Sequence, residues 1–318
     1  MSVLAARLDG PGDVLLSGPA VRALAASGPV DLLVGPAAVD AAALLPGVRD
    51  VLVLPAPWDG PPAAPVDAGA LEHLVDVLRR KDYDEAVVFT GTARSPLPLA
   101  VLLRLAGVGR VSGASEDYPG SLLDVRFRRP AGCHDLDAAL DLAAAAGHHL
   151  PPGDDGGLRV RDVPAAPVDL PRDFVVVHPG AGGPGGALPA ERATALVEAL
   201  RRSGHEVVVT GRHDERGLTA AVAGSRAVDL GGRTDLAGLA GVLAAAEAVV
   251  VAGGTVPALL AAAVGTPLVP SPAATRSPVP GHPVPPARSP RTVLAAVEAL
   301  ARPAWPTAPQ TVPSGAPS

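Results

Sequence analysis

One aspartate, Asp13, stands in a Gly-Asp-Val turn between a short apolar stretch and a helical pattern. Its carboxylate would be ionised at neutral pH and could accept a proton from an attacking hydroxyl, which is general base catalysis. The same charge could instead complement the dipole at the start of the following helix. The residues alone leave both roles for Asp13 open.

A glycine-rich segment in the second half of the chain is the best candidate for a ligand-binding loop. A β-branched run at residues 174–177 leads into residues 178–187, which contain five glycines and precede a helical pattern starting at Pro189. Glycine amides and the free N–H groups of a helix N-terminus can approach an anion closely. We therefore predict an anion-binding loop at residues 178–187.

Polar residues end two of the expected strands in this half of the chain. His178 either binds a phosphate or bonds to neighbouring backbone, and for a lone histidine the structural role is the more common one. Thr210 and Gly211 either contact the same anion or form an ordinary exit from a strand. The G-x-G-x-x-G spacing of dinucleotide oxidoreductases is absent from the glycine-rich segment.

Composition and charge argue against several classes of protein. The chain has 318 residues, 2% aromatic residues and a net charge of −6, so a nucleic-acid or anionic-membrane footprint is not indicated. Cys133 is the single cysteine, which excludes an internal disulfide and a cysteine-based zinc site. We interpret residues 148–149 and 213–215 as solvated side chains in exposed segments rather than metal ligands.

No apolar run reaches the ~18 residues of a transmembrane helix, and the N-terminus lacks the pattern of a signal peptide. These features predict a cytoplasmic protein.

Strand and helix patterns alternate through both halves, which is typical of parallel sheets. Residues 7–13 are expected to be a loop and residues 115–130 irregular. The expected strands are residues 3–6, 30–34, 51–54, 85–90, 108–113, 174–177, 206–210, 228–230, 248–252 and 268–269. The expected helices are residues 14–26, 37–45, 71–80, 96–106, 135–146, 189–202, 215–223, 236–246, 257–264 and 292–301.

Residues 150–172 show little periodicity and contain two proline clusters, which is typical of an interdomain linker. With the boundary near Pro167, we predict a first domain at residues 1–166, a second at residues 167–302 and a disordered tail at residues 303–318. Each domain is expected to be an α/β, Rossmann-like, doubly wound parallel sheet. Two such domains would face each other across a cleft.

Six segments, in order along the chain, carry a resemblance to glycosyltransferase family 9, the heptosyltransferase-like enzymes of the GT-B fold. No single motif is decisive, but together and in this order they are typical of the family. The matching segments are residues 7–24, 95–126, 178–182 (HPGAG), 210–224, 229–250 and 257–269.

This resemblance implies an inverting, metal-independent transfer of a sugar from a nucleotide-diphosphate donor, typically ADP-heptose, without a cofactor. The acceptor would be the hydroxyl of a saccharide or of a lipid-linked molecule, and the latter would bring the protein to the inner face of the membrane. The resemblance favours Asp13 as the general base. It implies that the donor is bound by His178, Gly180, Gly182, Thr210, Gly211, Gly253, Gly254 and Thr255.

The chain departs from the family at the donor phosphates. Family members usually carry a basic residue shortly before the helix that starts here at Pro189, whereas this chain has only residues 185–187, Gly-Gly-Ala. Glycine amides still donate hydrogen bonds, but the positive charge that would neutralise a leaving diphosphate is missing. Arg192 or Arg212 could substitute from other positions.

A second departure affects the loop at residues 253–259. The family commonly has Asn/Asp-Asp-Thr/Ser-Gly-Pro followed by a histidine, and the aspartate and histidine are replaced here by Gly254 and Leu259. The family also has an acidic or amide residue on the preceding helix that is associated with the ribose, and the corresponding residue here is Ala237. Each lost charge-assisted hydrogen bond is worth about 1.5–3 kcal/mol. The sequence therefore also supports an alternative, a catalytically impaired GT-B-fold protein that acts in binding or assembly.

Overall fold

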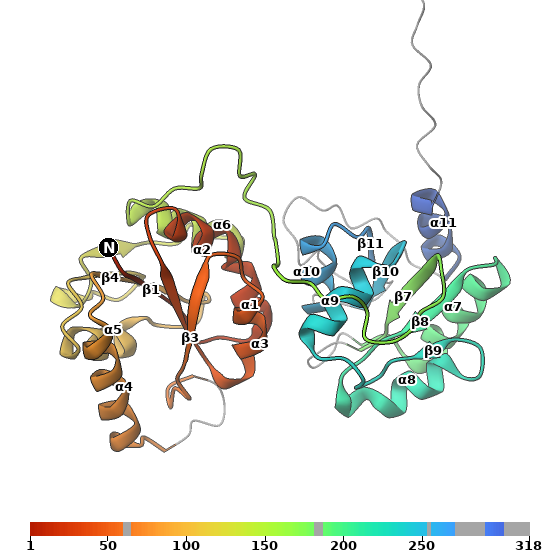
Figure 1. The fold of residues 1–318 in the computed structure, drawn as a ribbon, viewed down its shortest axis with the longest axis horizontal. Helices are drawn as coiled ribbons and strands as arrows, with labels where there is room; N and C mark the ends of the chain where they lie inside the picture. The colour runs from red at the N-terminus through yellow and green to blue at the C-terminus, as the bar shows by residue number, and fades with distance from the viewer. Residues whose placement is uncertain (60–64, 181–186, 253–255, 271–289, 302–318) are drawn as a thin grey trace, which may run out of the picture.

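The computed structural model describes residues 1–59, 65–180, 187–252, 256–270 and 290–301, and the predicted tail lies outside these ranges. Two parallel β-sheets, each with its own helices, lie side by side and are joined by one long connection (Figure 1). The predicted α/β fold with two Rossmann-like sheets is confirmed.

The first sheet has six parallel strands in the order β3-β2-β1-β4-β5-β6. Its central strands are buried on both faces, which explains why they read as continuous apolar runs rather than alternating ones. The strands are β1 (Val3–Arg7), β2 (Val30–Val34), β3 (Val48–Val53), β4 (Glu85–Phe89), β5 (Arg110–Ala114) and β6 (Val125–Phe127).

The second sheet has five parallel strands in the order β11-β10-β7-β8-β9. Both sheets are wound in the same way, so strand order reverses beside β1 in one and beside β7 in the other. Doubly wound sheets bind ligands at the carboxyl ends of strands near this reversal. The strands are β7 (Phe174–His178), β8 (Glu206–Val209), β9 (Val228–Asp229), β10 (Ala248–Val251) and β11 (Leu268–Pro270).

Helices cover both sheets, and some of them also form the contacts between the two domains. In Figure 1, α1 and α3 of the first domain face α9 and α10 of the second, and α1 contacts α10 while α3 contacts α9. The helices are α1 (Pro11–Leu16), α2 (Gly18–Ala25), α3 (Val39–Ala43), α4 (Ala68–Lys81), α5 (Leu97–Leu105), α6 (Asp135–Ala145), α7 (Ala190–Arg202), α8 (Arg216–Ala223), α9 (Leu236–Ala244), α10 (Val256–Ala263) and α11 (Pro290–Ala301). Short 3₁₀ turns are η1 (Pro36–Ala38), η2 (Gly120–Leu122) and η3 (His213–Glu215).

The single helix predicted at residues 14–26 was wrong, because this stretch forms two helices that meet at Ser17. Ser17 is the C-cap of α1 and the N-cap of α2, and its hydroxyl donates to the Asp13 carbonyl at 3.0 Å. Pro19 provides no backbone N–H, so the first helix cannot continue through it. Helix α1 also begins at Pro11, which moves Asp13 from the predicted loop into the first helical turn.

Residues 115–130, predicted to be irregular, contain a short edge strand, β6, which pairs with β5. Three residues are too few to show a strand period in sequence, and their pairing depends on the neighbouring strand.

His148, predicted to be exposed, is instead 4% exposed. Gly147 ends α6 with φ of 96°, and this turn returns the chain toward the sheet. There His148 Nε2 lies 2.9 Å from Glu85 Oε2, and Nδ1 lies 3.1 Å from Ser27 Oγ. The ring is therefore a structural link between α6, α2 and β4.

Among the residues that the structure describes, no helix is both long enough and apolar enough to cross a bilayer.

Candidate active site

A cavity of about 1500 Å³ opens between the two domains at the carboxyl ends of their strands. Loops after β1, β4, β5 and β6 form one wall, and the ends of β7 and β8 with helices α9 and α10 form the other. This is where doubly wound sheets bind ligands. Its polar lining residues include Asp13, Asp40, Thr90, Thr92, Arg94, Ser115, Glu116, Arg129, Cys133, His134, Asp135, His178, Arg212, Thr234 and Asp235.

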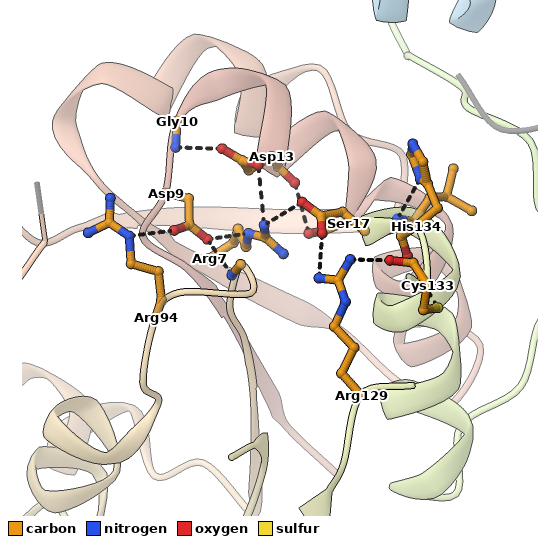
Figure 2. Close-up of polar contacts among 12 residues, drawn as sticks. Arg7, Asp9, Gly10, Asp13, Ser17, Arg94, Arg129, Cys133 and His134 are labelled. Atoms are coloured by element: carbon orange, nitrogen blue, oxygen red, sulfur yellow. Dashed lines mark hydrogen bonds and ion pairs between the residues drawn. The ribbon is translucent and has the colours of Figure 1, made fainter. Parts of the chain in front are cut away.

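Asp13 occupies the third position of α1 and lines the cavity. Its Oδ2 accepts a hydrogen bond from the Gly10 N–H at 3.1 Å, and its Oδ1 lies 3.3 Å from Arg7 Nη2 (Figure 2). The side chain remains 37% exposed. Asp13 thus completes the helix N-terminus and also presents a carboxylate to the cavity, so its two proposed roles are compatible.

Burial raises the pKa of Asp13 above its usual range. Arg7 lowers the pKa of Asp13, while the negative charges of Asp9 and Asp135 raise it further and the Gly10 N–H lowers it. A carboxylate with a raised pKa holds a proton more tightly and is therefore a stronger base.

Two arginines continue the ionic network along the first-domain wall (Figure 2). Arg94 forms ion pairs with Asp59 and, at 3.6 Å, with Asp9. Arg129 forms an ion pair with Asp135 and donates to the Cys133 carbonyl. None of the three arginines of this network, Arg7, Arg94 and Arg129, was predicted as a site residue from the sequence. A charged residue closing an apolar strand, as Arg7 does, is the signal that could have revealed the first of them.

His178 ends β7 and faces the cavity with 5% exposure. Its Nδ1 lies 3.0 Å from Thr210 Oγ1, and its Nε2 lies 4.0 Å from Glu215 Oε2. Burial lowers the pKa of His178 to about 4, against the opposing effect of Glu215. At neutral pH the imidazole is uncharged, so His178 can offer a hydrogen bond but not a positive charge to a ligand.

Gly180 and Gly211 both lie close to side chains of the protein itself. A Cβ atom at Gly180 would lie 2.1 Å from Glu215 Oε1, and one at Gly211 would lie 2.5 Å from Thr219 Cγ2. Gly211 lines the cavity, whereas Gly180 is absent from the described residues that line it. Thr210 is fully buried behind His178. Close packing against Thr219 is therefore a sufficient reason for glycine at position 211. At Gly180 the neighbouring atoms are the end of the flexible Glu215 side chain, which can move aside.

The remaining donor-site candidates, Gly182, Gly253, Gly254 and Thr255, lie outside the described residues. In α10, Leu259 lines the cavity and is 4% exposed. It is the residue that the resemblance matches to a histidine of the family. Among the described lining residues of the second domain, Arg212 is the one arginine. Its side chain is 59% exposed and lies 3.1 Å from Asp214.

Solved structures with the same architecture include several heptosyltransferases. E. coli ADP-heptose lps heptosyltransferase II is 22% identical, with a TM-score of 0.75 over 94% of this chain and 98% of that one. E. coli heptosyltransferase WaaC with ADP-2-deoxy-2-fluoro heptose is 20% identical, with a TM-score of 0.72 over 95% and 100% of the two chains. A family 9 glycosyl transferase from Veillonella parvula is 15% identical, with a TM-score of 0.69 over 85% and 79%.

No curated protein matches the chain. The family model of glycosyltransferase family 9 (heptosyltransferase) matches residues 72–276, which is more than half of the sequence and includes loops from both walls of the cavity. The chain belongs to glycosyltransferase family 9.

Proposed function

We propose that this protein transfers a heptose-like sugar from a nucleotide-diphosphate donor to an acceptor hydroxyl, with inversion and without a metal ion. The acceptor is a saccharide or a lipid-linked molecule, and the latter would bring this cytoplasmic protein to the inner face of the membrane. The observation that carries the proposal is Asp13, a partly exposed carboxylate of raised pKa in an interdomain cavity. The similar fold of WaaC, solved with ADP and with ADP-2-deoxy-2-fluoro heptose, supports this donor class.

In the proposed step, the acceptor oxygen attacks the anomeric carbon of the donor sugar while its proton moves to the Asp13 carboxylate. The bond between the anomeric carbon and the phosphate oxygen breaks, and the nucleoside diphosphate leaves with the electron pair. One base and one group that stabilises the leaving charge are sufficient for this reaction. Among the described lining residues of the second domain, Arg212 is the candidate for the second group.

Other carboxylates of the cavity are less suited to act as the base. Asp135 is paired with Arg129, and Asp235 caps α9 by accepting the Gly238 N–H at 2.7 Å. Asp40 and Glu116 are exposed to solvent, where a carboxylate has little reason to become more basic. Asp13 combines partial burial with access to the cavity, which favours it as the proton acceptor.

A catalytically impaired protein that acts in binding or assembly is the second candidate. The apolar Leu259 in the cavity, beside Gly12, favours it, because a leucine cannot bond to a phosphate or a sugar. Nucleotide binding without turnover would identify this function.

The donor class is tested by thermal unfolding with ADP, UDP, GDP and their sugar conjugates. A ligand at 100 times its Kd stabilises the native state by about 2.7 kcal/mol, so a bound donor should raise Tm measurably. We expect ADP conjugates to protect the protein and Arg212→Gln to weaken this protection, because the arginine stands at the second-domain wall.

Arg226→Gln is the matched control, since Arg226 is exposed just after α8 and is absent from the described lining residues of the cavity. Equal loss of protection in both variants would remove Arg212 from the donor site. If no nucleotide or nucleotide sugar changes Tm, the transferase proposal fails.

The pH dependence of turnover is a further expected result. A base must be ionised, so turnover should fall on the acid side as pH decreases through the pKa of Asp13. Because burial raises the pKa of Asp13, the midpoint of this loss should lie above the value of about 3.9 for an unperturbed aspartate. Initial rates under saturating donor, from pH 4 to 9, measure the midpoint, and a flat profile across this range would contradict the assignment.

A further inference from the structure

Arg7 is a buried charge for which sequence analysis gave no role. It closes β1, and its side chain is 2% exposed. A buried guanidinium is unfavourable unless partners of opposite charge surround it. Three carboxylates from different segments do so: Asp9 at 2.6 Å, Asp13 at 3.3 Å and Asp135 at 3.7 Å.

These three carboxylates differ in their other partners. Asp9 also pairs with Arg94 and accepts the Gly91 N–H at 3.2 Å, while Asp135 also pairs with Arg129. Among the described residues, Arg7 is the one ion-pair partner of Asp13. Loss of Arg7 should therefore affect Asp13 more than the other two carboxylates.

The contacts of Asp13 also restrict its orientation. The Gly10 N–H binds Oδ2 and the Arg7 guanidinium lies against Oδ1, so both oxygens have a partner on the protein side. Asp13 is nevertheless the most exposed of the three carboxylates, at 37% against 11% for Asp9 and 26% for Asp135. Two contacts from fixed groups leave the rest of the carboxylate directed toward the cavity.

We propose that Arg7 is a positioning residue for Asp13. One guanidinium nitrogen of Arg7 fixes Oδ1 of the carboxylate, while the Gly10 N–H fixes Oδ2. The consequence for turnover rests on the proposed function, but the contact itself does not. Arg7 shares the charge of its guanidinium among three carboxylates, so it orients Asp13 without forming the close bidentate pair that would neutralise it.

Charged groups on several elements act on Asp13 and must be considered together. Arg7 is the last residue of β1, and Asp9 lies in the loop after it. Asp135 is the first residue of α6 and is paired with Arg129. Asp40 of α3 lines the same cavity, and α10 faces α1 with apolar side chains, Val256 and Leu259. A test must therefore separate the effect of the contact with Arg7 from the electrostatic effect of all the charged residues on the first-domain wall of the cavity.

The test is a ¹³C NMR titration of aspartate carboxyl groups in the full-length protein, without donor or acceptor. Loss of one resonance in Asp13→Asn identifies the signal of Asp13. We expect Asp13 to titrate at higher pH in Arg7→Gln than in the wild type, because its nearest cation is gone. Arg129→Gln removes an equal charge from the same wall but from a residue that pairs with Asp135, and it should move the Asp13 signal less.

Equal shifts in the two variants, or no shift in Arg7→Gln, would overturn the proposal. Arg7→Lys keeps the charge on a single, shorter donor, and it decides the question if Arg7→Gln does not fold. With a donor that turns over, Arg7→Lys should lower kcat by about 10²-fold at unchanged donor KM, as misplacement of a reacting group does. Wild-type titration together with wild-type kcat in Arg7→Lys would also overturn it. Because the titration uses no substrate, its outcome is independent of the proposed transferase activity.

Discussion

Asp13→Asn is expected to lower the rate of sugar transfer by about 10²- to 10⁴-fold, the usual contribution of a general base. Asparagine has nearly the same shape as aspartate, and its amide oxygen can keep the bond from the Gly10 N–H. It cannot accept the proton of the acceptor hydroxyl. Donor affinity should change little, because Asp13 lies on the first-domain wall, so the loss should appear in kcat rather than in nucleotide Kd.

Asp40→Asn provides the matched control for this prediction. Asp40 lines the same cavity from α3 but is exposed and has no part in the proposed step. Initial rates at saturating donor and calorimetric nucleotide binding should be compared for both variants. If Asp13→Asn turns over as fast as the wild type, Asp13 is not the base. If both variants lose the same activity, the cavity charge rather than a specific base is responsible.

Much of the fold could be predicted because it depends on local pattern. Each expected strand is present, since runs such as residues 174–177 are apolar enough to be buried on both faces of a parallel sheet. The position of Asp13 could also be predicted, because a turn between a strand and a helix places its residues at the carboxyl edge of the sheet. The break of the helix at Ser17 was not predicted, although Pro19, which favours the first turn of a helix, is a signal for it.

The ionic network around Asp13 could not be predicted from pattern. The network brings together residues that are dozens of positions apart: Arg7, Asp59, Arg94 and Arg129. They come close only because the end of β1 and three loops converge on the same edge of the sheet. Hydrophobic periodicity carries no information on which charged loop residues will meet. His148 was misjudged for the same reason, since its partner Glu85 is distant in sequence.

The connection between the domains contains a second buried ion pair with a large expected effect on stability. Arg22 of α2 donates to both oxygens of Asp154, at 2.7 and 2.8 Å, and to the Gly157 carbonyl at 2.8 Å. Farther along, Arg161 donates to the Val48 carbonyl at 2.7 Å. Residues 154–161 are thereby bound to the first domain.

The next residues of this connection pack on the second domain instead. A Cβ atom at Gly241 of α9 would lie 2.4 Å from the Pro164 carbonyl oxygen, and one at Gly238 would lie 3.5 Å from Pro167 Cγ. Asp162, between Arg161 and Pro164 in the chain, has a left-handed backbone conformation with φ of 50°. The connection therefore passes from the first domain to the second between residues 161 and 164.

Asp154→Ala is expected to destabilise the first domain by about 3–5 kcal/mol, because it leaves the Arg22 guanidinium buried without its partner. Both side chains are less than 10% exposed, so neither can turn to solvent while the fold is intact. Urea unfolding followed by Trp58 fluorescence, in a Trp305→Phe background, measures the loss. Asp155→Ala is the matched control, since Asp155 is 72% exposed, and it should change stability much less than Asp154→Ala does.

The pH dependence of stability gives the same pair an independent test. Arg22 holds the pKa of Asp154 far below its usual range, so the stabilisation is present above the unfolded-state pKa of about 3.9 and is lost as pH falls below it. Asp154→Ala should therefore differ most from the wild type at neutral pH and progressively less in acid. The double variant Arg22→Met with Asp154→Leu removes both charges and should be more stable than Asp154→Ala, because no unpaired charge remains buried. If the double variant loses as much stability as Arg22→Met and Asp154→Leu lose in total when made singly, the two side chains act independently and not as an ion pair.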